Sequence, residues 1–210
     1  MTETAECWTP VALSTDLPAA TVMPAITPAG AVALWRSRSG RLSAFADRCP
    51  HRGMRLSHGF VRDEALSCIY HGWRYAESGT CLKIPAHPAL TPPEAIRVST
   101  FRAEEAGGIV WVAAGAPSSP PPVFAGLDPL RSLTAAADLE AMAAAGATTG
   151  ETGLATTADG LSLLLAPQGE ATLIHVLVAA GSSLEARIAA SRRAEALRRA
   201  AEAQARRRAA

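Results

Sequence analysis

Residues 49–73 read CPHRGMRLSHGFVRDEALSCIYHGW and hold two cysteines and three histidines within twenty-five residues. Outside this stretch, the 210-residue chain has only two more cysteines and two more histidines. Thiols and imidazoles are ligands that proteins use for soft and borderline metals, so their concentration here predicts a metal site. The donor spacing is Cys49-x-His51, sixteen intervening residues, then Cys68-x-x-His71.

Two kinds of metal site accept two cysteines and two histidines. A structural zinc ion takes all four side chains in a tetrahedron. A [2Fe–2S] cluster of mixed ligation takes two cysteines on one iron and two histidines on the other. Each segment here supplies one cysteine and one histidine, so each would bridge both irons, whereas most zinc sites pair like with like. The spacing favours the cluster and leaves zinc as the alternative.

The flanking residues fit loops that close tightly around such a centre. Gly53 and Gly72 follow the histidines, and glycine lets the backbone turn and bring N–H groups towards sulfur. Pro50 stiffens the first loop. Trp73 is placed to shield the centre from water while leaving the histidine edges exposed.

Composition narrows the class of protein. Apolar residues make up 49% of the chain and charged residues 19%, as in globular proteins with a core. The first twenty residues are acidic and interrupted by Pro10 and Pro18, unlike a signal peptide, and the longest apolar run, at residues 173–180, is too short to cross a bilayer. We therefore expect a cytoplasmic protein without a membrane partner. Residues 184–210 hold eight arginines and three glutamates but no aromatics, which indicates a solvated helix face rather than a nucleic-acid surface.

Short strands are predicted through the first half of the chain. Alternating apolar and polar residues on both sides of Ser39-Gly40 predict a β-hairpin over residues 31–49. Further strands are predicted between glycine-bearing turns, at residues 65–69, 80–84, 96–101 and 109–112. This pattern is typical of a small antiparallel sandwich or barrel, with the two donor-rich segments at hairpin tips.

Composition changes after the first half. Three consecutive prolines at 120–122 favour an extended, semi-rigid segment, so we expect a domain over residues 1–115, a linker over 116–126 and a small α+β region over 127–210. The elements predicted there are a helix over 128–145 ended by Gly146, a hairpin over 161–178 that turns at 167–169, and a long basic helix from Ser182 with Glu185 at capping-box spacing. The predicted fold class is therefore a mostly β domain followed by a small α+β region.

The segments CPHRGMRLSHGFV and CIYHGWRY resemble the Rieske domain of bacterial terminal oxygenases, the ring-hydroxylating dioxygenases and vanillate-demethylase-like monooxygenases. The resemblance runs from CWTPVALSTDLP through LKIPAHP to GGIVWVAAGAP, over roughly residues 7–117. It implies one [2Fe–2S] Rieske cluster, with Cys49 and Cys68 on one iron and His51 and His71 on the other.

Two positions depart from respiratory Rieske proteins, which carry an extra cysteine in each loop and join the two in a disulfide. Met54 and Tyr70 stand at those places here. Without the disulfide, and with fewer hydrogen-bond donors to the sulfurs, we expect a reduction potential in the lower part of the Rieske range of about −150 to +300 mV.

The second half lacks the residues of a mononuclear iron site. Oxygenases of this family hold such an iron with two histidines and one carboxylate, and His175 is the one histidine beyond the prolines. His175 lies in an apolar run and is expected to pack in a core, while His58 and His87 are expected at the surface. Cys7 and Cys81 are expected to bind no metal. We therefore assign no catalytic residue and expect no mononuclear iron within this chain.

The function that these features favour is single-electron transfer. A reductase or ferredoxin would donate the electron, and a full-length oxygenase subunit is the possible acceptor. One alternative is an oxygenase or demethylase of aromatic or similar small molecules, whose iron site is unconventional or built between chains. Another is a non-redox binding module with a structural cluster or zinc.

Overall fold

The computed structural model describes residues 8–113, 115–150 and 153–209, and its chain divides into two compact units. The first unit takes most of residues 8–121. The second comprises Pro122–Ala210 with the short segments Pro10–Leu13 and Ala106–Ile109. In the described part of the chain, no helix is both long and apolar enough to cross a membrane.

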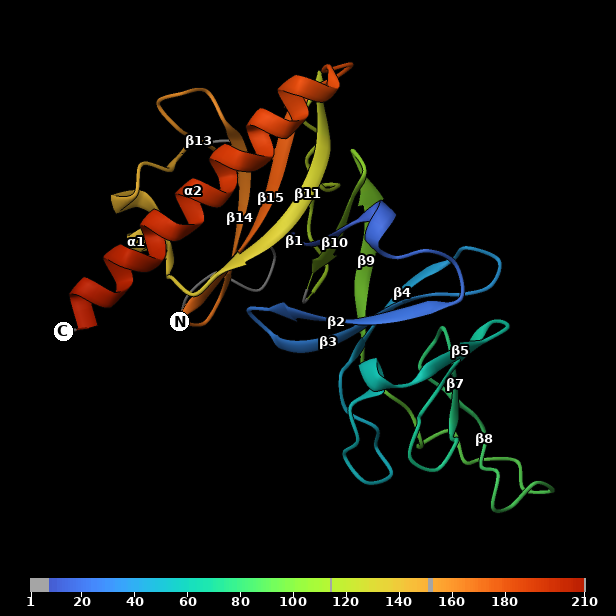
Figure 1. Cartoon of the computed structure of the whole chain (residues 1–210). Helices are drawn as coiled ribbons and strands as arrows, with labels where there is room; N and C mark the ends of the chain where they lie inside the picture. The colour runs from blue at the N-terminus through green and yellow to red at the C-terminus, as the bar shows by residue number, and fades with distance from the viewer. Residues whose placement is uncertain (1–7, 114, 151–152, 210) are drawn as a thin grey trace. The chain divides into compact units, whose positions relative to one another are not determined.

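Two antiparallel sheets form the frame that carries the donor-rich loops (Figure 1). The larger has the order β1-β10-β9-β4-β3-β2, with β1 (Thr9–Leu13), β2 (Thr21–Thr27), β3 (Gly30–Arg36), β4 (Leu42–Ala46), β9 (Thr100–Ala106) and β10 (Ile109–Ala113). The smaller has the order β5-β6-β7-β8, with β5 (Phe60–Arg62), β6 (Ala65–Ser67), β7 (Arg74–Ala76) and β8 (Cys81–Lys83). Two short 3₁₀ turns, Ser14–Asp16 and Leu56–His58, complete this part.

The predicted hairpin is confirmed. β3 and β4 pair antiparallel across the Ser39-Gly40 turn, where Gly40 has a φ of +93°, a left-handed conformation that glycine adopts without steric cost. This hairpin places Trp35 and Phe45 in the core with their rings edge to face at 5.4 Å. Of the other predicted strands, those at 65–69, 80–84 and 109–112 are present, whereas the one at 96–101 begins only at Thr100.

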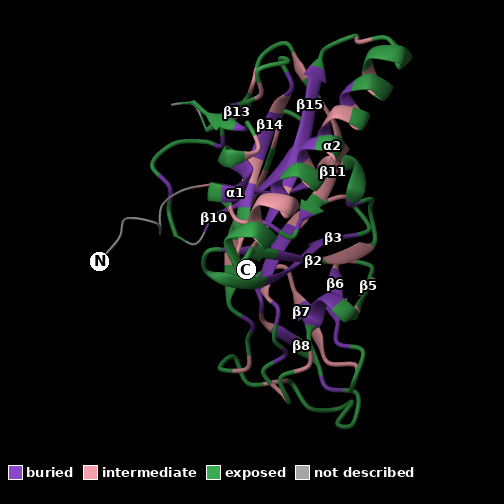
Figure 2. Ribbon diagram, turned by 60° about the vertical axis from the view of Figure 1, so that its left-hand side comes forward, coloured by how far each residue is buried: buried purple, intermediate pink, exposed green. Residues whose placement is uncertain are grey.

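The second unit is a five-stranded antiparallel sheet with a long helix across one face (Figure 1). Its strand order is β11-β15-β14-β13-β12, with β11 (Leu127–Ala135), β12 (Thr148–Thr149), β13 (Leu154–Thr156), β14 (Ser162–Gln168) and β15 (Ala171–Ala179). Its helices are α1 (Leu139–Ala144) and α2 (Leu184–Ala209). β15 lies between β11 and β14 and is buried along most of its length (Figure 2). The predicted fold class, mostly β with an α+β region after it, is confirmed.

The predicted helix over residues 128–145 is wrong for most of its length. Residues 127–135 form β11, which pairs with β15, and helix α1 begins only after Asp138. The alanines that favour a helix lie mostly at residues 135–145, whereas residues 127–135 pair with a buried strand and pack Leu130 and Leu133 on the core. The predicted end is correct, because Gly146 follows α1 with a φ of +105°.

Helix α2 begins at Leu184, two residues after the predicted start at Ser182. The hydroxyl of Ser183 accepts the N–H of Ala186 at 3.2 Å and caps the helix, while the hydroxyl of Ser182 donates to the Ala179 carbonyl. One side of α2 packs on the sheet through mostly small residues, namely Ala190, Ala194, Leu197 and Ala201. Arginines on its exposed sides form ion pairs, for example Arg198 with Glu195 at 2.7 Å.

Candidate metal centre

The first donor-rich loop lies between β4 and β5 and is closed by its own backbone. The N–H of Cys49 donates to the Met54 carbonyl at 2.8 Å, and the N–H of Gly53 donates to the Cys49 carbonyl at 2.8 Å. Gly53 has a φ of +71°, so a residue with a side chain would be strained there. The loop therefore holds Cys49 in place without help from a disulfide.

The second loop, between β6 and β7, repeats this closure. The N–H of Cys68 donates to the Trp73 carbonyl at 2.9 Å, and the N–H of Gly72 donates to the Cys68 carbonyl at 3.0 Å. Gly72 has a φ of +68°, close to that of its counterpart in the first loop. The prediction of two tight glycine turns is confirmed, and the two turns have the same hydrogen-bond pattern.

The four predicted donors separate into two pairs of like kind. Cys49 and Cys68 are each 2% exposed and belong to the core beneath the loops. His51 is partly exposed and His71 is exposed, and their ring centroids lie 4.7 Å apart. The thiol pair is thus buried and the imidazole pair lies at the surface.

Electrostatics differ between the two pairs. Burial raises the pKa of the Cys68 thiol, the backbone N–H groups of Tyr70 and His71 oppose that rise, and the neighbouring Cys49 thiol adds to it. The pKa of His51 is lowered by desolvation and by the nearby positive charges of His71 and Arg52. The neutral imidazole, which is the form that binds metal, is therefore favoured at His51.

Aromatic side chains fix the orientation of the imidazoles. The indole of Trp73 stacks on the His51 ring with centroids 4.3 Å apart and an interplanar angle of 7°. The Tyr70 ring lies against His71 at a centroid distance of 3.9 Å. Tyr70 itself is exposed, so one face of the imidazole pair is covered by Trp73 while an edge of His71 faces solvent.

Tyr75 is a functional contact that the sequence reasoning missed. Its hydroxyl lies 3.1 Å from the sulfur of Cys49, and the side chain is fully buried. Burial, and then the contact with Cys49, raises the pKa of the phenol far above its usual value, so the hydroxyl keeps its proton. A metal-bound Cys49 is a thiolate, to which this hydroxyl would donate. The expectation of few hydrogen-bond donors to the sulfurs therefore overlooked the Tyr75 hydroxyl.

Asp47 is a second residue that the sequence reasoning missed. Its buried carboxylate accepts the backbone N–H and the hydroxyl of Ser57, each at 2.7 Å. These two bonds tie the start of the first loop to its end. No spacing rule identifies such a brace, because its two residues belong to no ligand motif.

Of the remaining predicted residues that the structure describes, only Cys81 lies near the donors, in the same buried cluster as Cys49 and Cys68. His58 and His87 are exposed, and Cys81 is buried with its thiol 3.8 Å from the Lys83 carbonyl oxygen. His175 lies in the second unit, fully buried in β15, with its Nδ1 2.8 Å from the hydroxyl of Ser132. Cys7 falls outside the described residues.

The donor set fits a [2Fe–2S] cluster of mixed ligation. In the described parts of the chain, no three His, Cys, Asp or Glu side chains converge as the ligands of a single ion would. Each iron of a mixed-ligand cluster takes only two protein ligands, and the chain presents one thiol pair and one imidazole pair. Backbone N–H groups next to the Cys68 sulfur supply the hydrogen bonds that metal-bound thiolates accept.

Comparison with known proteins agrees with this geometry. The Rieske [2Fe–2S] domain family matches residues 7–101. The oxidoreductase NdmD of Pseudomonas putida is 44% identical over 116 residues, and the oxygenase subunit of the 3-chlorobenzoate-3,4-dioxygenase of Comamonas testosteroni is 34% identical over 112 residues. These alignments cover 54% and 52% of the chain but only 20% and 26% of the two relatives.

The fold likeness extends beyond the matched domain. The crystal structure of dicamba monooxygenase superposes with a TM-score of 0.76, covering 100% of this chain and 89% of that one at 19% sequence identity. NdmB of Pseudomonas putida superposes with a TM-score of 0.75 over 96% of this chain and 83% of that chain, at 18% identity. At such low identity, the likeness concerns the fold alone.

Proposed function

Residues 7–101 form a Rieske [2Fe–2S] domain related to those of aromatic-ring oxygenases, and from this premise we propose that the chain carries single electrons to an oxygenase iron site. Cys49 and Cys68 would hold one iron, and His51 and His71 the other. The bound cluster would supply a one-electron redox centre. The donor is a reductase or ferredoxin, and the acceptor is a full-length oxygenase subunit.

The position of the imidazole pair is the observation that carries this proposal. Electron transfer needs a centre that is shielded from water yet reachable by a partner. The thiol pair lies in the core, Trp73 covers one face of His51, and His71 is exposed. The His71 edge is thus the point at which a partner comes nearest to the centre.

We propose the same three-part organisation that the sequence suggests. Residues 1–115 would act as the redox domain and 116–126 as a linker, which is supported by the lack of helix or strand in that segment. Residues 127–210 would form a separate α+β region. This region would serve as a scaffold or an assembly surface, because His175 is buried in its sheet and is available to no substrate.

An oxygenase or demethylase is the second candidate, and the 34% identity over 112 residues to an oxygenase subunit of Comamonas testosteroni favours it. In that case, an iron site would be completed by residues of another chain. The two candidates differ in metal content, since an oxygenase holds an additional iron.

The decisive experiment measures iron, acid-labile sulfide and zinc per chain in protein purified without added metal. Two irons with two sulfides support the electron carrier, a third iron supports the oxygenase, and zinc without sulfide rejects both. Electron paramagnetic resonance of the reduced protein should give the rhombic signal of a cluster with mixed ligation. Replacing His71 with cysteine should move that signal towards the all-cysteine type, and an unchanged signal would reject His71 as a ligand.

A turnover assay separates the two candidates functionally. The purified chain, given a reductase and oxygen, should convert no aromatic substrate alone and should support conversion once a full-length oxygenase subunit is added. Turnover by the isolated chain would overturn the carrier proposal in favour of the oxygenase.

A further inference from the structure

Several basic side chains in and near the two donor loops have no acidic partner in the described part of the chain. No acidic residue occurs in residues 48–62 or 65–76. Three cations in the first loop and one each on β7 and β8 form no ion pair with a residue that the structure describes. They are Arg48, Arg52, Arg55, Arg74 and Lys83, which we call the basic loop face; all are exposed except the half-buried Arg74.

Two of these cations repel each other within the fold. Arg74 on β7 and Lys83 on β8 are direct partners across the sheet. Like charges in directly opposed positions of a sheet are destabilising, so stability alone does not favour this pair. A carboxylate brought by another molecule would relieve the repulsion.

The other end of the same small sheet shows the opposite arrangement. Two acidic residues lie in the turn between β5 and β6. Asp63 forms an ion pair with Arg38 at 3.4 Å, and Glu64 forms one with Arg41 at 3.2 Å. Arg41 also reaches Glu77 at 2.8 Å. Cations are thus compensated away from the loops and left uncompensated beside them.

Apolar side chains lie within the basic loop face. Ile69 and Tyr70, both in the second loop, are 56% and 57% exposed and directly precede His71. A partly apolar contact area surrounded by charge has the composition of a protein interface with a polar rim. The exposed imidazole edge would lie within that interface.

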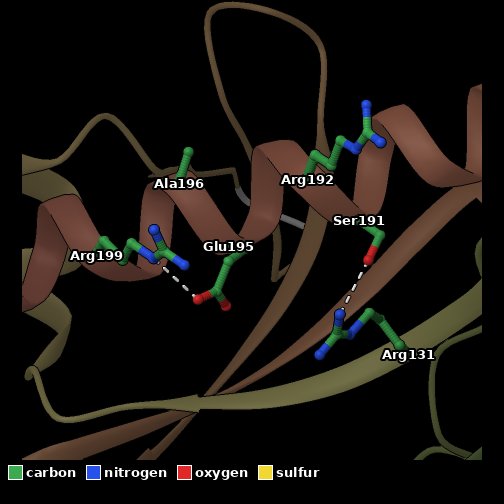
Figure 3. A pocket seen from close by; sticks show the side chains of 6 residues that line it. All are labelled: Arg131, Ser191, Arg192, Glu195, Ala196 and Arg199. Carbon is green, nitrogen blue, oxygen red and sulfur yellow. Dashed lines mark hydrogen bonds and ion pairs between the residues drawn. The ribbon is translucent and has the colours of Figure 1, made fainter.

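A groove of about 580 Å³ on α2 is the competing basic surface (Figure 3). There Arg131 donates to the hydroxyl of Ser191 at 2.9 Å and Arg199 donates to Glu195 at 3.1 Å, so both cations have partners within the chain. Arg192 points away from them and is exposed (Figure 3). Among the described residues, only Arg199 is opposed by a carboxylate, so this groove also carries positive charge, but none of the four donor side chains lines it. Arg192 is therefore a control for charge that lies outside the donor loops.

We propose that the basic loop face docks an acidic redox protein, one whose carboxylates surround its own electron-carrying centre. The inference rests on the proposed electron-transfer function and names the chemistry of the donor. Attraction between opposite charges would bring the donor centre to the His71 edge, and the apolar residues of the second loop would make the close contact. Such steering raises association rates at low salt and weakens as salt screens the charges.

The test uses the full cluster-containing chain and two probes of opposite charge, an acidic plant-type ferredoxin and a basic c-type cytochrome, both oxidised. Dissociation constants are measured by calorimetry at about 0.03 M and 0.3 M salt, where the screening length falls from roughly 20 Å to below 8 Å. We expect the ferredoxin to bind more tightly than the cytochrome at low salt. The variant Arg52→Glu/Arg55→Glu should raise the ferredoxin dissociation constant by about tenfold or more, and the difference should shrink at high salt.

Two further variants keep the test decisive. Arg192→Glu reverses one charge in the second unit and should leave the ferredoxin affinity unchanged. Lys83→Glu lies on a strand outside the loops, so it should weaken binding even where the double variant fails to retain its cluster. Equal ferredoxin affinity in wild type and Lys83→Glu, or equally tight binding of the cytochrome, would overturn the docking proposal.

Failure of docking and failure of the proposed function give different results. Reduction by dithionite, followed by visible absorbance, tests the redox centre without any protein partner. If dithionite reduces the centre but charge reversal leaves the ferredoxin affinity unchanged, only the docking proposal is rejected. A chain that dithionite cannot reduce removes the electron-transfer function, whatever its binding behaviour.

Discussion

Replacing Tyr75 with phenylalanine removes one hydroxyl from the buried side of the thiol pair. The phenol oxygen lies 3.1 Å from the Cys49 sulfur, and its ring packs in the core with Trp35 and Phe45. Phenylalanine keeps that ring, so the fold should survive. A sulfur ligand carries more negative charge when the centre is reduced, and a donated hydrogen bond therefore stabilises the reduced state more than the oxidised one.

The size of the effect follows from the bond that is lost. Only the difference in hydrogen-bond strength between the two redox states moves the potential, and we take it as about 1 kcal/mol. For a one-electron couple, 59 mV corresponds to a tenfold change in equilibrium constant, so about 1 kcal/mol lowers the potential by about 40 mV. We expect Tyr75→Phe to have a reduction potential lower than the wild type by this amount.

Spectroelectrochemical titration of the two proteins, followed by visible absorbance, measures the shift. Tyr70→Phe is the matched control, because Tyr70 is the only other tyrosine and lies against His71 rather than beside a sulfur. Its potential should equal that of the wild type. An unchanged potential in Tyr75→Phe, or an equal fall in Tyr70→Phe, would refute the role of the hydroxyl.

Three further outcomes test other parts of the structure. His175→Ala should lower the free energy of unfolding by about 1–3 kcal/mol, through a lost hydrogen bond and a cavity, as measured by denaturant titration; loss of the cluster would contradict its packing role. Gly59→Ala should yield no cluster-containing protein, because a Cβ there would lie 2.2 Å from the Ser67 carbonyl oxygen, and normal visible absorbance would contradict this. Hydrogen bonding from Arg198 lowers the pKa of Glu195 to about 2 from an ordinary 4.5. The depressed value means that its stabilising contribution is present above about pH 4.5 and lost as the pH falls towards 2, so the helical circular dichroism signal should fall there and fall less in Glu195→Gln.

A second glycine variant gives the control for Gly59→Ala. Gly40 has a φ of +93° but no atom within 4 Å of a built Cβ. Gly40→Ala therefore adds backbone strain without a collision, and the protein should still fold and take up its cluster. Loss of the cluster in both variants would show that the close approach at Gly59 is not the cause.

The sequence identifies the donors because their chemistry resides in the side chains themselves. Two cysteines and two histidines at that spacing are informative before any fold is known. Tyr75 and Asp47 were missed for a different reason. Tyr75 is separated from Cys49 by 26 residues and Asp47 from Ser57 by 10, so only the folded backbone brings each pair together.

The second unit shows where local preference fails. Residues 128–135 were predicted as the start of a helix, yet they belong to a strand because β15 offers a buried partner. The partner strand lies about 40 residues further along the chain, as in the pairing of Ser132 with His175. The hairpin of β14 and β15 was predictable, since its own alternation and its turn are local.

The repeated closure of the two loops separates what must stay fixed from what is free to change. In each loop, a cysteine N–H and a glycine N–H make the closing hydrogen bonds, and the cysteine points into the core. Pro50 and Arg52 in the first loop, and Ile69 in the second, make none of these bonds and are exposed. Substitutions at such positions would alter which proteins recognise the surface without disturbing the thiol pair. A family built on this frame can therefore acquire new partners by point mutation while its redox centre remains the same.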